Sequence, residues 1–255
     1  MPPSTEPKIA LVTGAASGIG EAIARRLAQD GMTVLVSDCD MAAAERTASE
    51  FCAAGLCAEA LVLDVADAAS VAAAFGIIRE RYGRCDVQVN NAGVAKTFSF
   101  VDYPLDEFER TLRVNLVGTL LCAQHAARLM LERGWGRIVN IASVAGMRAV
   151  GSGRTGYGTS KAAVIGLTRQ MSSELAPYGI TANAVAPGPV DTPMTKVLHS
   201  AEFRDAYIRA IPMQRYGLPE EVAATVSFLA SDAAAYLTGA TLPVDGGFMA
   251  AGALG

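Results

Sequence analysis

The sequence lacks the residue patterns that mark several classes of protein. Its five cysteines include no C-x-x-C pair, and its two histidines lie far apart, so neither a disulfide framework nor a zinc site is indicated. No apolar run is long enough to span a membrane, and the polar, proline-containing start has no hydrophobic region of a signal peptide. We therefore expect no bound metal, no membrane association and a cytoplasmic protein with reduced thiols.

Charge is also scarce. Charged residues make up 18% of the chain, the net charge is -4 and the pI is near 5.3. Without a block of basic residues, nucleic acid is not an expected partner. Hydrophobic residues account for 51% of the 255 positions, which is typical of a compact globular protein.

Short apolar runs alternate with helical patterns along the whole chain. One helix is expected over Val71 to Arg81, with Ser70 as its cap. Continuous apolar strands between helices predict an α/β fold with a doubly wound parallel sheet, Rossmann-like and about seven-stranded. The expected strands are 9–12, 33–36, 60–63, 87–89, 137–141, 181–185 and 240–244.

The domain organisation follows from the absence of linkers and repeats. We expect a flexible tail over residues 1–7 and one domain over residues 8–255. The segment 192–217 interrupts the alternation and carries several apolar side chains. It is either a mobile flap over a pocket or an ordinary surface helix packed on the core.

A glycine-rich turn joins the first strand to the first helix in the segment Thr13 to Gly20. Gly14 permits the tight turn, Gly18 lets backbone approach a phosphate, and Gly20 allows close helix packing. The spacing is G-x-x-x-G-x-G, which differs from the G-x-G-x-x-G fingerprint. By itself this turn is compatible with nucleotide binding or with simple strand–helix packing.

Asp38 ends the second predicted strand, where a carboxylate accepts hydrogen bonds from an adenosine ribose. The same carboxylate repels a 2′-phosphate, and Asp40 adds to the negative field. NAD is therefore favoured over NADP. Other cofactor contacts are expected at the carboxyl ends of the third and fourth strands: Asp64, Val65, Asn91, Ala92 and Gly93.

Tyr157 is followed four residues later by Lys161. On a helix these side chains lie on one face, so the ammonium group favours the ionised phenol and lowers a pKa that is ordinarily about 10. Together with a nucleotide turn, this pair predicts hydride chemistry on an alcohol or a ketone.

The motifs taken together resemble the short-chain dehydrogenase/reductase family, in its single-domain branch. The resemblance extends from Thr13 to Gly247, and its motifs occur in the family's order. They are T-G-x-x-x-G-I-G at 13–20, N-N-A-G at 90–93, Asn115, Ser143, Y-x-x-x-K at 157–161, Pro187-Gly188 and V-D-G-G at 244–247.

The resemblance implies a role for each matching residue. Tyr157 would be the general acid/base, Lys161 would lower its pKa and hold the nicotinamide ribose, and Ser143 would bond the substrate oxygen. Asn115 would hold a water in a proton relay that reaches Lys161. The implied cofactor contacts are Gly14, Ser17, Gly18, Ile19, Gly20, Tyr157, Lys161, Pro187, Gly188, Val190 and Thr192.

The chain departs from the family at the substrate pocket, because the interval from Ser143 to Tyr157 is one residue longer than usual. The expected pocket residues are Ser143, Ala145, Met147, Arg148, Arg154 and Met194. The two arginines either bind a carboxylate or phosphate of the substrate or are simply solvated.

Three functions remain open at this point. The first is an NAD-dependent dehydrogenase of a secondary alcohol such as a polyol, sugar or hydroxy acid. The second is a 3-oxoacyl thioester reductase, against which Asp38 weighs because such reductases commonly prefer NADPH. The third is a dinucleotide sensor without turnover. The resemblance also implies a homotetramer, with the helical segments 116–132 and 157–176 paired between subunits, although their apolar faces fit an internal core equally well.

Overall fold

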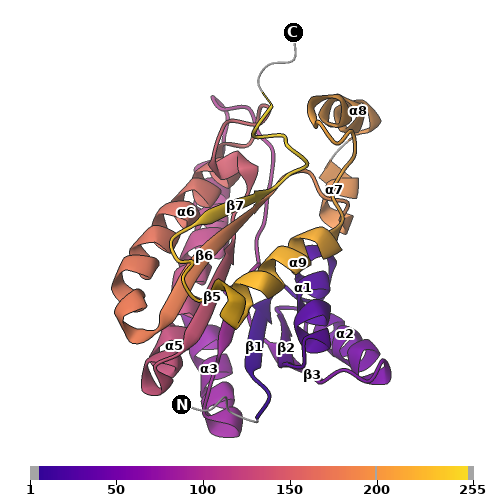
Figure 1. Cartoon of the computed structure of the whole chain (residues 1–255). Coiled ribbons are helices and arrows are strands. Elements are labelled where there is room, and N and C mark those ends of the chain that lie inside the picture. Colours follow the sequence, from indigo (N-terminus) through magenta and orange to yellow (C-terminus); the bar gives the residue numbers. More distant parts are fainter. Residues whose placement is uncertain (1–5, 199, 252–255) are drawn as a thin grey trace.

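The computed structural model describes residues 6–198 and 200–251, and these form one α/β domain around a seven-stranded sheet (Figure 1). Every predicted strand is confirmed to within two residues at either end. All neighbouring strands are parallel, in the order β3-β2-β1-β4-β5-β6-β7. The strands are β1 Ile9–Thr13, β2 Thr33–Asp38, β3 Ala58–Val62, β4 Val87–Asn90, β5 Gly136–Ile141, β6 Ile180–Pro187 and β7 Thr241–Val244.

Helices cover both faces of this sheet, as Figure 1 shows. The first cover contains α1 Gly18–Gln29, α2 Met41–Ala53 and α9 Pro219–Ala230. The opposite cover contains α3 Ala68–Tyr82, α5 Gly118–Arg133 and α6 Thr155–Leu175, with the short α4 Leu105–Leu112 beside α6.

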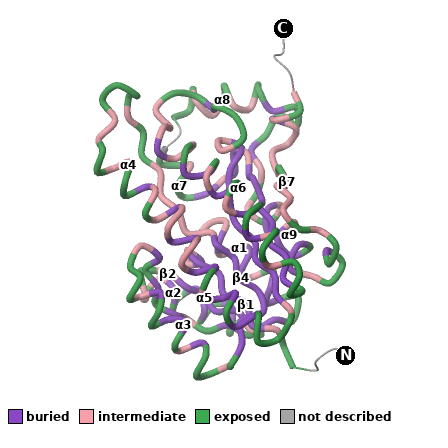
Figure 2. Tube along the Cα trace, turned by 90° about the vertical axis from the view of Figure 1, so that its left-hand side faces the viewer, coloured by how far each residue is buried: buried purple, intermediate pink, exposed green. Residues whose placement is uncertain are grey.

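The two covers explain why the strands are rich in apolar residues. Val34 and Val36 of β2 pack into the core beneath α1 and α2, whereas Leu35 between them packs into the core beneath α3 and α5. Successive side chains of a strand point to opposite faces. Both faces of the central strands β1, β4, β5 and β6 are therefore buried, whereas the edge strands β3 and β7 are partly exposed (Figure 2).

The N-terminus of α3 differs from the prediction. The helix begins at Ala68, where Asp67 caps it by accepting a hydrogen bond from the amide of Ala69 at 2.9 Å. Ser70 lies inside the first turn, and its hydroxyl accepts a hydrogen bond from the amide of Asp64 at 3.0 Å. The cap prediction at Ser70 was wrong because an aspartate three residues earlier performs that role.

The segment 192–217 folds into two helices, α7 Pro193–Leu198 and α8 Ala201–Ala210. Both lie beyond the carboxyl ends of the strands (Figure 1). An isolated parallel bridge between Val190 and Gly217 closes the base of the segment. The segment therefore lies over the edge of the sheet at which ligands of doubly wound folds bind.

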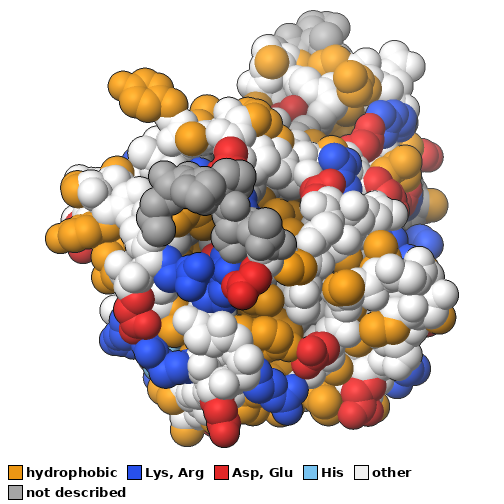
Figure 3. All heavy atoms as spheres, turned by 60° about the horizontal axis from the view of Figure 1, so that its bottom comes forward, with side chains coloured by type: hydrophobic (Ala, Val, Ile, Leu, Met, Phe, Trp, Pro, Cys, Tyr) orange, Lys and Arg blue, Asp and Glu red, His pale blue; other side chains and the backbone are white. Residues whose placement is uncertain are grey.

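The surface opposite α7 and α8 carries side chains of both charges without a broad patch of one sign (Figure 3). Three of the cysteines, Cys39, Cys52 and Cys57, are exposed thiols, and only Cys85 and Cys122 are buried. Most of the cysteines therefore lie outside the core. Within residues 6–198 and 200–251, no helix combines the length and apolarity needed to cross a membrane.

Candidate active site

One cavity opens at the carboxyl ends of β1, β2, β4, β5 and β6, and most of the predicted site residues line it. It brings the β1–α1 turn together with Asp38, the residues after β4 and β5, the face of α6 and the start of α7. Its lining is Gly14, Ser17, Gly18, Ile19, Gly20, Asp38, Asn91, Ala92, Gly93, Ile141, Ala142, Ser143, Tyr157, Lys161, Pro187, Gly188, Val190, Thr192, Pro193, Met194 and Thr195.

The β1–α1 turn is shaped by its glycines. Gly14 has a φ of +62°, in the left-handed region that glycine tolerates. A Cβ on Gly20 would lie 2.1 Å from the carbonyl oxygen of Gly14, so α1 begins directly against the turn. Ser17 at the N-cap makes no side-chain hydrogen bond to the helix. The first amides of α1 therefore have no side-chain cap, as in helix termini that bind phosphate.

Asn91 holds this turn from the neighbouring strand. Its side-chain amide donates to the carbonyl oxygens of Thr13 at 2.9 Å and Gly14 at 3.0 Å. In return, the Thr13 hydroxyl accepts from the amides of Asn91 at 3.0 Å and Ala92 at 3.1 Å. The sequence analysis included Thr13 in the glycine-rich motif but assigned it no role, although a threonine at the end of a strand beside a glycine turn was the available signal.

Asp38 reaches the other end of the cavity from the last position of β2. Its carboxylate accepts a hydrogen bond from the amide of Asp40 at 3.1 Å. The carboxylate of Asp40 itself caps α2 by accepting from the amide of Ala43 at 3.1 Å. Asp38 therefore supplies the carboxylate that lines the cavity, while Asp40 is engaged in the adjacent helix cap.

Asp64 and Val65 do not line the cavity. Asp64 is exposed, and its carboxylate accepts from the amide of Ala66 at 2.9 Å in a local turn. Val65 is buried against α5. A Cβ added to Gly118 of α5 would lie 2.8 Å from the Cβ of Val65. Asp64 closes the turn after β3 and Val65 packs against α5, and their predicted cofactor contact stays a prediction.

Ser143, Tyr157 and Lys161 converge from two elements. Ser143 follows β5 and accepts a hydrogen bond from the amide of Ala145 at 3.1 Å, while Tyr157 and Lys161 lie on one face of α6. Tyr157 shares a hydrogen bond with the Ser143 hydroxyl. The Lys161 ammonium donates to the carbonyl oxygen of Ile141 at 2.7 Å and lies 5.7 Å from the centre of the Tyr157 ring.

The Tyr157 pKa is raised above its ordinary value, chiefly because burial disfavours the phenolate. The Ser143 hydrogen bond and the charge of Arg154 act in the opposite direction. The predicted net lowering by Lys161 was therefore wrong for this structure. The Lys161 ammonium donates to the Ile141 carbonyl oxygen, and the half-buried Tyr157 side chain lines the cavity.

Lys161 is only 4% exposed. Burial lowers its pKa to about 8, because the ammonium loses hydration. Of the residues that line the cavity in the described chain, Lys161 alone carries a positive charge.

Asn115 stands behind the cavity in a π-helical turn, Arg113–Val117, between α4 and α5. Its side-chain oxygen accepts from the amide of Val94 at 2.8 Å, and its nitrogen donates to the Val94 carbonyl at 3.0 Å and to the Ser160 hydroxyl at 2.9 Å. Asn115 thus ties the strand end after β4 to α6. Its role in a proton relay stays a prediction.

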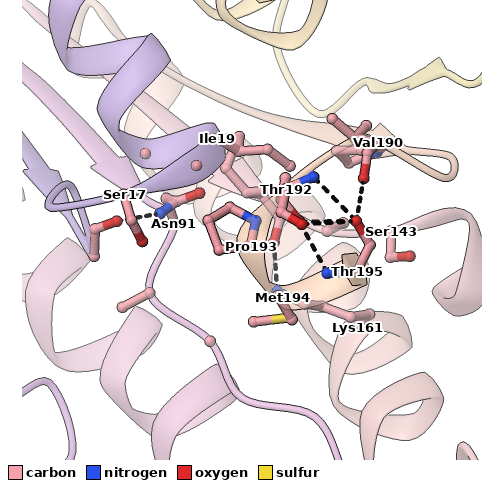
Figure 4. A pocket seen from close by; sticks show the side chains of 18 of the residues that line it. Ser17, Ile19, Asn91, Ser143, Lys161, Val190, Thr192, Pro193, Met194 and Thr195 are labelled. Atoms are coloured by element: carbon pink, nitrogen blue, oxygen red, sulfur yellow. Dashed lines mark hydrogen bonds between the residues drawn. The ribbon is translucent and has the colours of Figure 1, made fainter. Parts of the chain in front are cut away.

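Thr195 organises the part of the cavity after β6, as Figure 4 shows. Its hydroxyl accepts from the amide of Thr192 at 3.0 Å and donates to the carbonyl oxygen of Val190 at 2.7 Å. The Thr192 hydroxyl accepts from the amide of Thr195 at 3.2 Å. Sequence reasoning named Val190 and Thr192 but missed Thr195, which lies two residues after Pro193 in the first turn of α7.

The predicted substrate residues divide into two groups. Met194 lines the cavity, and Ser143 stands at its reactive end. Ala145, Met147, Arg148 and Arg154 do not line it. Ala145 instead packs beside Val144 in an apolar cluster with Tyr207 and Phe248. Among the described residues, no group of three or more His, Cys, Asp or Glu side chains is placed to hold a metal ion.

Comparison with known proteins agrees with this geometry. A family model described as enoyl-(acyl carrier protein) reductase matches residues 14–249. The 3-oxoacyl-[acyl-carrier-protein] reductase FabG of Aquifex aeolicus is 42% identical over 244 residues, covering 94% of this chain and 96% of the relative. The 3-oxoacyl-[acyl-carrier-protein] reductase of Synechocystis is 43% identical over 244 residues, covering 95% and 97%.

A solved structure gives the same result. The gluconate 5-dehydrogenase of Burkholderia cenocepacia, crystallised with NADP and tartrate, superposes with a TM-score of 0.92 at 37% identity and covers 96% of both chains. The chain belongs to the short-chain dehydrogenase/reductase family. It is therefore an oxidoreductase of a family that binds NAD(P), and the sensor alternative is set aside.

The cavity of this short-chain dehydrogenase/reductase fits a dinucleotide. The β1–α1 turn has no side chain at Gly14, Gly18 or Gly20, and it presents the N-terminus of α1 to a pyrophosphate. Asp38 lines the cavity at the end of β2, where its carboxylate would accept hydrogen bonds from the ribose hydroxyls of such a cofactor.

The burial of Lys161 predicts a pH-dependent stability. Below about pH 8 the lysine is charged in both the folded and the unfolded chain. Between about pH 8 and its ordinary pKa of about 10.4 the unfolded chain binds the extra proton, so the free energy of unfolding of the native enzyme rises with pH. In this window we expect the free energy of unfolding of the native enzyme, measured relative to that of the Lys161→Met variant, to rise by about 1.4 kcal/mol per pH unit. Denaturant titrations from pH 7 to 10 measure this difference, with the exposed Lys196→Met as control; a pH-independent difference would contradict the prediction.

Proposed function

We propose that the enzyme reduces the keto group of a 3-oxoacyl thioester to a secondary alcohol with NADH, and catalyses the reverse oxidation. The observation that carries this proposal is a single cavity with a glycine turn and Asp38 at one end and Ser143, Tyr157 and Lys161 at the other. The thioester class is supported by the relatives named 3-oxoacyl-[acyl-carrier-protein] reductase, which are 42–43% identical along nearly the whole chain.

The proposed mechanism divides the reaction between cofactor and protein. The bound nicotinamide supplies or accepts the hydride. During reduction, Tyr157 donates its phenolic proton to the substrate oxygen, and the Ser143 hydroxyl donates a hydrogen bond to the charge that develops there. Lys161 would hold the ribose hydroxyls of the nicotinamide half of the cofactor and would place a positive charge beside the phenolate that remains. Tyr157 is then reprotonated from solvent, through the side of the site bounded by Asn115.

The preference for NAD rests on the charges at the adenosine end. Asp38 is the carboxylate there, and Lys161, the one cation in the lining of the described cavity, lies at the opposite end. A ribose with free hydroxyls donates hydrogen bonds to this carboxylate, whereas a 2′-phosphate faces an uncompensated like charge.

A second substrate class is a secondary alcohol of the polyol, sugar or hydroxy-acid type, which the sequence analysis placed first. The likeness to gluconate 5-dehydrogenase favours it. The relatives of higher sequence identity support the thioester better, because their names agree with one another and the identity is 42–43% rather than 37%.

Turnover of both substrate classes with both cofactors tests the proposal. We expect 3-oxoacyl thioesters to be reduced with a higher kcat/KM than 5-ketogluconate, and NADH to exceed NADPH by about ten-fold or more, equivalent to about 1.4 kcal/mol. Initial rates at 340 nm measure both ratios. A preference for NADPH would reject the role of Asp38, and turnover of the sugar acid alone would reject the thioester.

Tyr157→Phe tests the proton donor. The variant keeps the ring and its packing but lacks the hydroxyl, so we expect kcat to fall by about 10²–10⁴-fold while the NADH dissociation constant stays within about two-fold. Tyr178→Phe, at a tyrosine that is 56% exposed on the surface, is the matched control. Unchanged turnover in the Tyr157 variant would remove this residue from the mechanism.

We also propose a cytoplasmic homotetramer in which α5 and α6 pair between subunits. Ala123, Ala127, Val164 and Met171 of the expected interface are buried within the subunit. The pairing would therefore use half-buried apolar residues of the same helices, such as Leu167. Sedimentation equilibrium should give four times the subunit mass; a single subunit at micromolar concentration would reject the assembly.

A further inference from the structure

Two arginines flank a row of aromatic rings beside the reactive end of the cavity. The guanidinium carbon of Arg148 lies 4.7 Å from the centre of the Phe248 ring, and that of Arg154 lies 5.8 Å from the centre of the Phe203 ring. Tyr207 of α8 stands between these rings, 5.6 Å from Phe248 and 4.8 Å from Phe203. The row therefore joins α8 to the segment after β7, and the two arginines contact it from the loop before Tyr157.

The row adjoins the catalytic serine. Val144, the residue after Ser143, packs in one apolar cluster with Phe248 and Tyr207. The amide of Arg148 donates to the Val144 carbonyl oxygen at 3.1 Å, so this arginine begins one turn beyond Ser143. Arg154 is the N-cap residue of α6, three positions before Tyr157. Arg148 thus follows Ser143 by five residues and Arg154 precedes Tyr157 by three, so each arginine lies close in sequence to one of these two residues.

Arg148 and the nearby Arg204 differ in the groups that lie next to their guanidinium charges. Arg204 of α8 forms an ion pair with Asp191 at 2.6 Å. Arg148 is exposed and rests on the Phe248 ring, and within the described part of the chain no carboxylate lies within ion-pair distance of it. A guanidinium held on an aromatic face keeps its N–H groups directed outward for a planar anion.

The field of these arginines reaches the phenols. Burial raises the pKa of Tyr207, and the charges of Arg154 and Arg148 oppose that rise. The charge of Arg154 opposes the rise in the pKa of Tyr157 in the same way. The positive potential therefore extends over the space between α8 and the proton donor.

We infer that Arg148 and Arg154, presented on the Phe203–Tyr207–Phe248 row, form an anion-binding subsite for the substrate. This rests on the proposed function for the position of the reacting carbon, and it assigns the substrate class: a ketone or alcohol that carries a carboxylate or phosphate. The two arginines are specificity-determining residues. A phosphate of a thioester carrier and the carboxylate of a sugar acid are the two sources of this chemistry.

Matched pairs of substrates test the subsite. One pair is a 3-oxoacyl-CoA, which carries phosphates, and the same acyl group on neutral N-acetylcysteamine. The other pair is 5-ketogluconate and a neutral ketose of the same length. For Arg148→Gln and Arg154→Gln we expect kcat/KM to fall about 10- to 100-fold on the anionic member of the pair that is used, mainly through KM, and less than about three-fold on the neutral member.

Arg209→Gln is the control, because Arg209 is exposed on α8 and the change in net charge is the same. We expect this variant to retain the wild-type preference for the anionic member. An equal loss on charged and neutral members, or the same loss in Arg209→Gln, would overturn the subsite.

The pairs separate failure of the subsite from failure of the proposed function. If thioesters are turned over equally well with and without phosphates, and equally well by the wild-type enzyme and the arginine variants, the subsite is overturned and the proposed function stands. If only the sugar acid is turned over, and its turnover depends on the arginines, the subsite stands and the proposed thioester reduction is rejected. Calorimetry with tartrate gives a readout without turnover: wild-type enzyme should bind it at least ten-fold more tightly than the double variant, and equal binding by the two would overturn the inference.

Discussion

The contact between α6 and the end of β5 is the constraint on which the site depends. Lys161 donates its buried ammonium hydrogen bond to the Ile141 carbonyl at 2.7 Å. Close by, a Cβ on Gly146 would lie 2.5 Å from the backbone carbon of Lys161. No side chain fits between the turn after β5 and the helix. Ser143 is therefore fixed relative to Tyr157 by backbone packing as well as by their hydrogen bond.

The sheet supplies the rest of the arrangement. The order of strands places β1 beside β4, and the chain turns outward in opposite directions from these two central strands. Their carboxyl ends are linked by the Thr13 and Asn91 hydrogen bonds, which hold the glycine turn open at the point where the helices on either side diverge. Because Asn115 then ties the segment after β4 to Ser160 of α6, one polar network joins the cofactor turn to the catalytic helix.

Local patterns in the sequence were sufficient for the sheet and for most of the cavity. Continuous apolar runs such as Val34 to Val36 identified strands because both faces of a parallel sheet are dry. Asp38 and the glycine turn followed from their positions at strand ends. The helix start at Asp67 and the hydroxyl of Thr195 were missed, since several polar residues near a helix terminus compete for the same role and only the backbone geometry selects one.

Residues whose role depends on distant neighbours were harder to predict. Asp64 and Val65 follow a strand, as cofactor-binding residues do, but the carboxylate of Asp64 closes a local turn and Val65 fills the space opposite Gly118. The raised pKa of Tyr157 also depends on residues that are distant in the sequence. The spacing of Tyr157 and Lys161 placed a charge near a phenol, whereas the balance of burial against charge depends on every element packed around the site.

The distribution of charge across the site unites cofactor and substrate recognition. Asp38 makes the adenosine end negative, Lys161 places a single buried positive charge at the reactive centre, and the arginines beyond Ser143 extend the positive potential toward α8. A phenolate formed at Tyr157 thus lies between two sources of positive charge, one buried and one at the surface. An exposed charge is screened by salt and a buried one is much less so. The charge of Lys161 would therefore persist beside Tyr157 at high ionic strength, whereas the proposed action of the arginines on substrate binding would weaken.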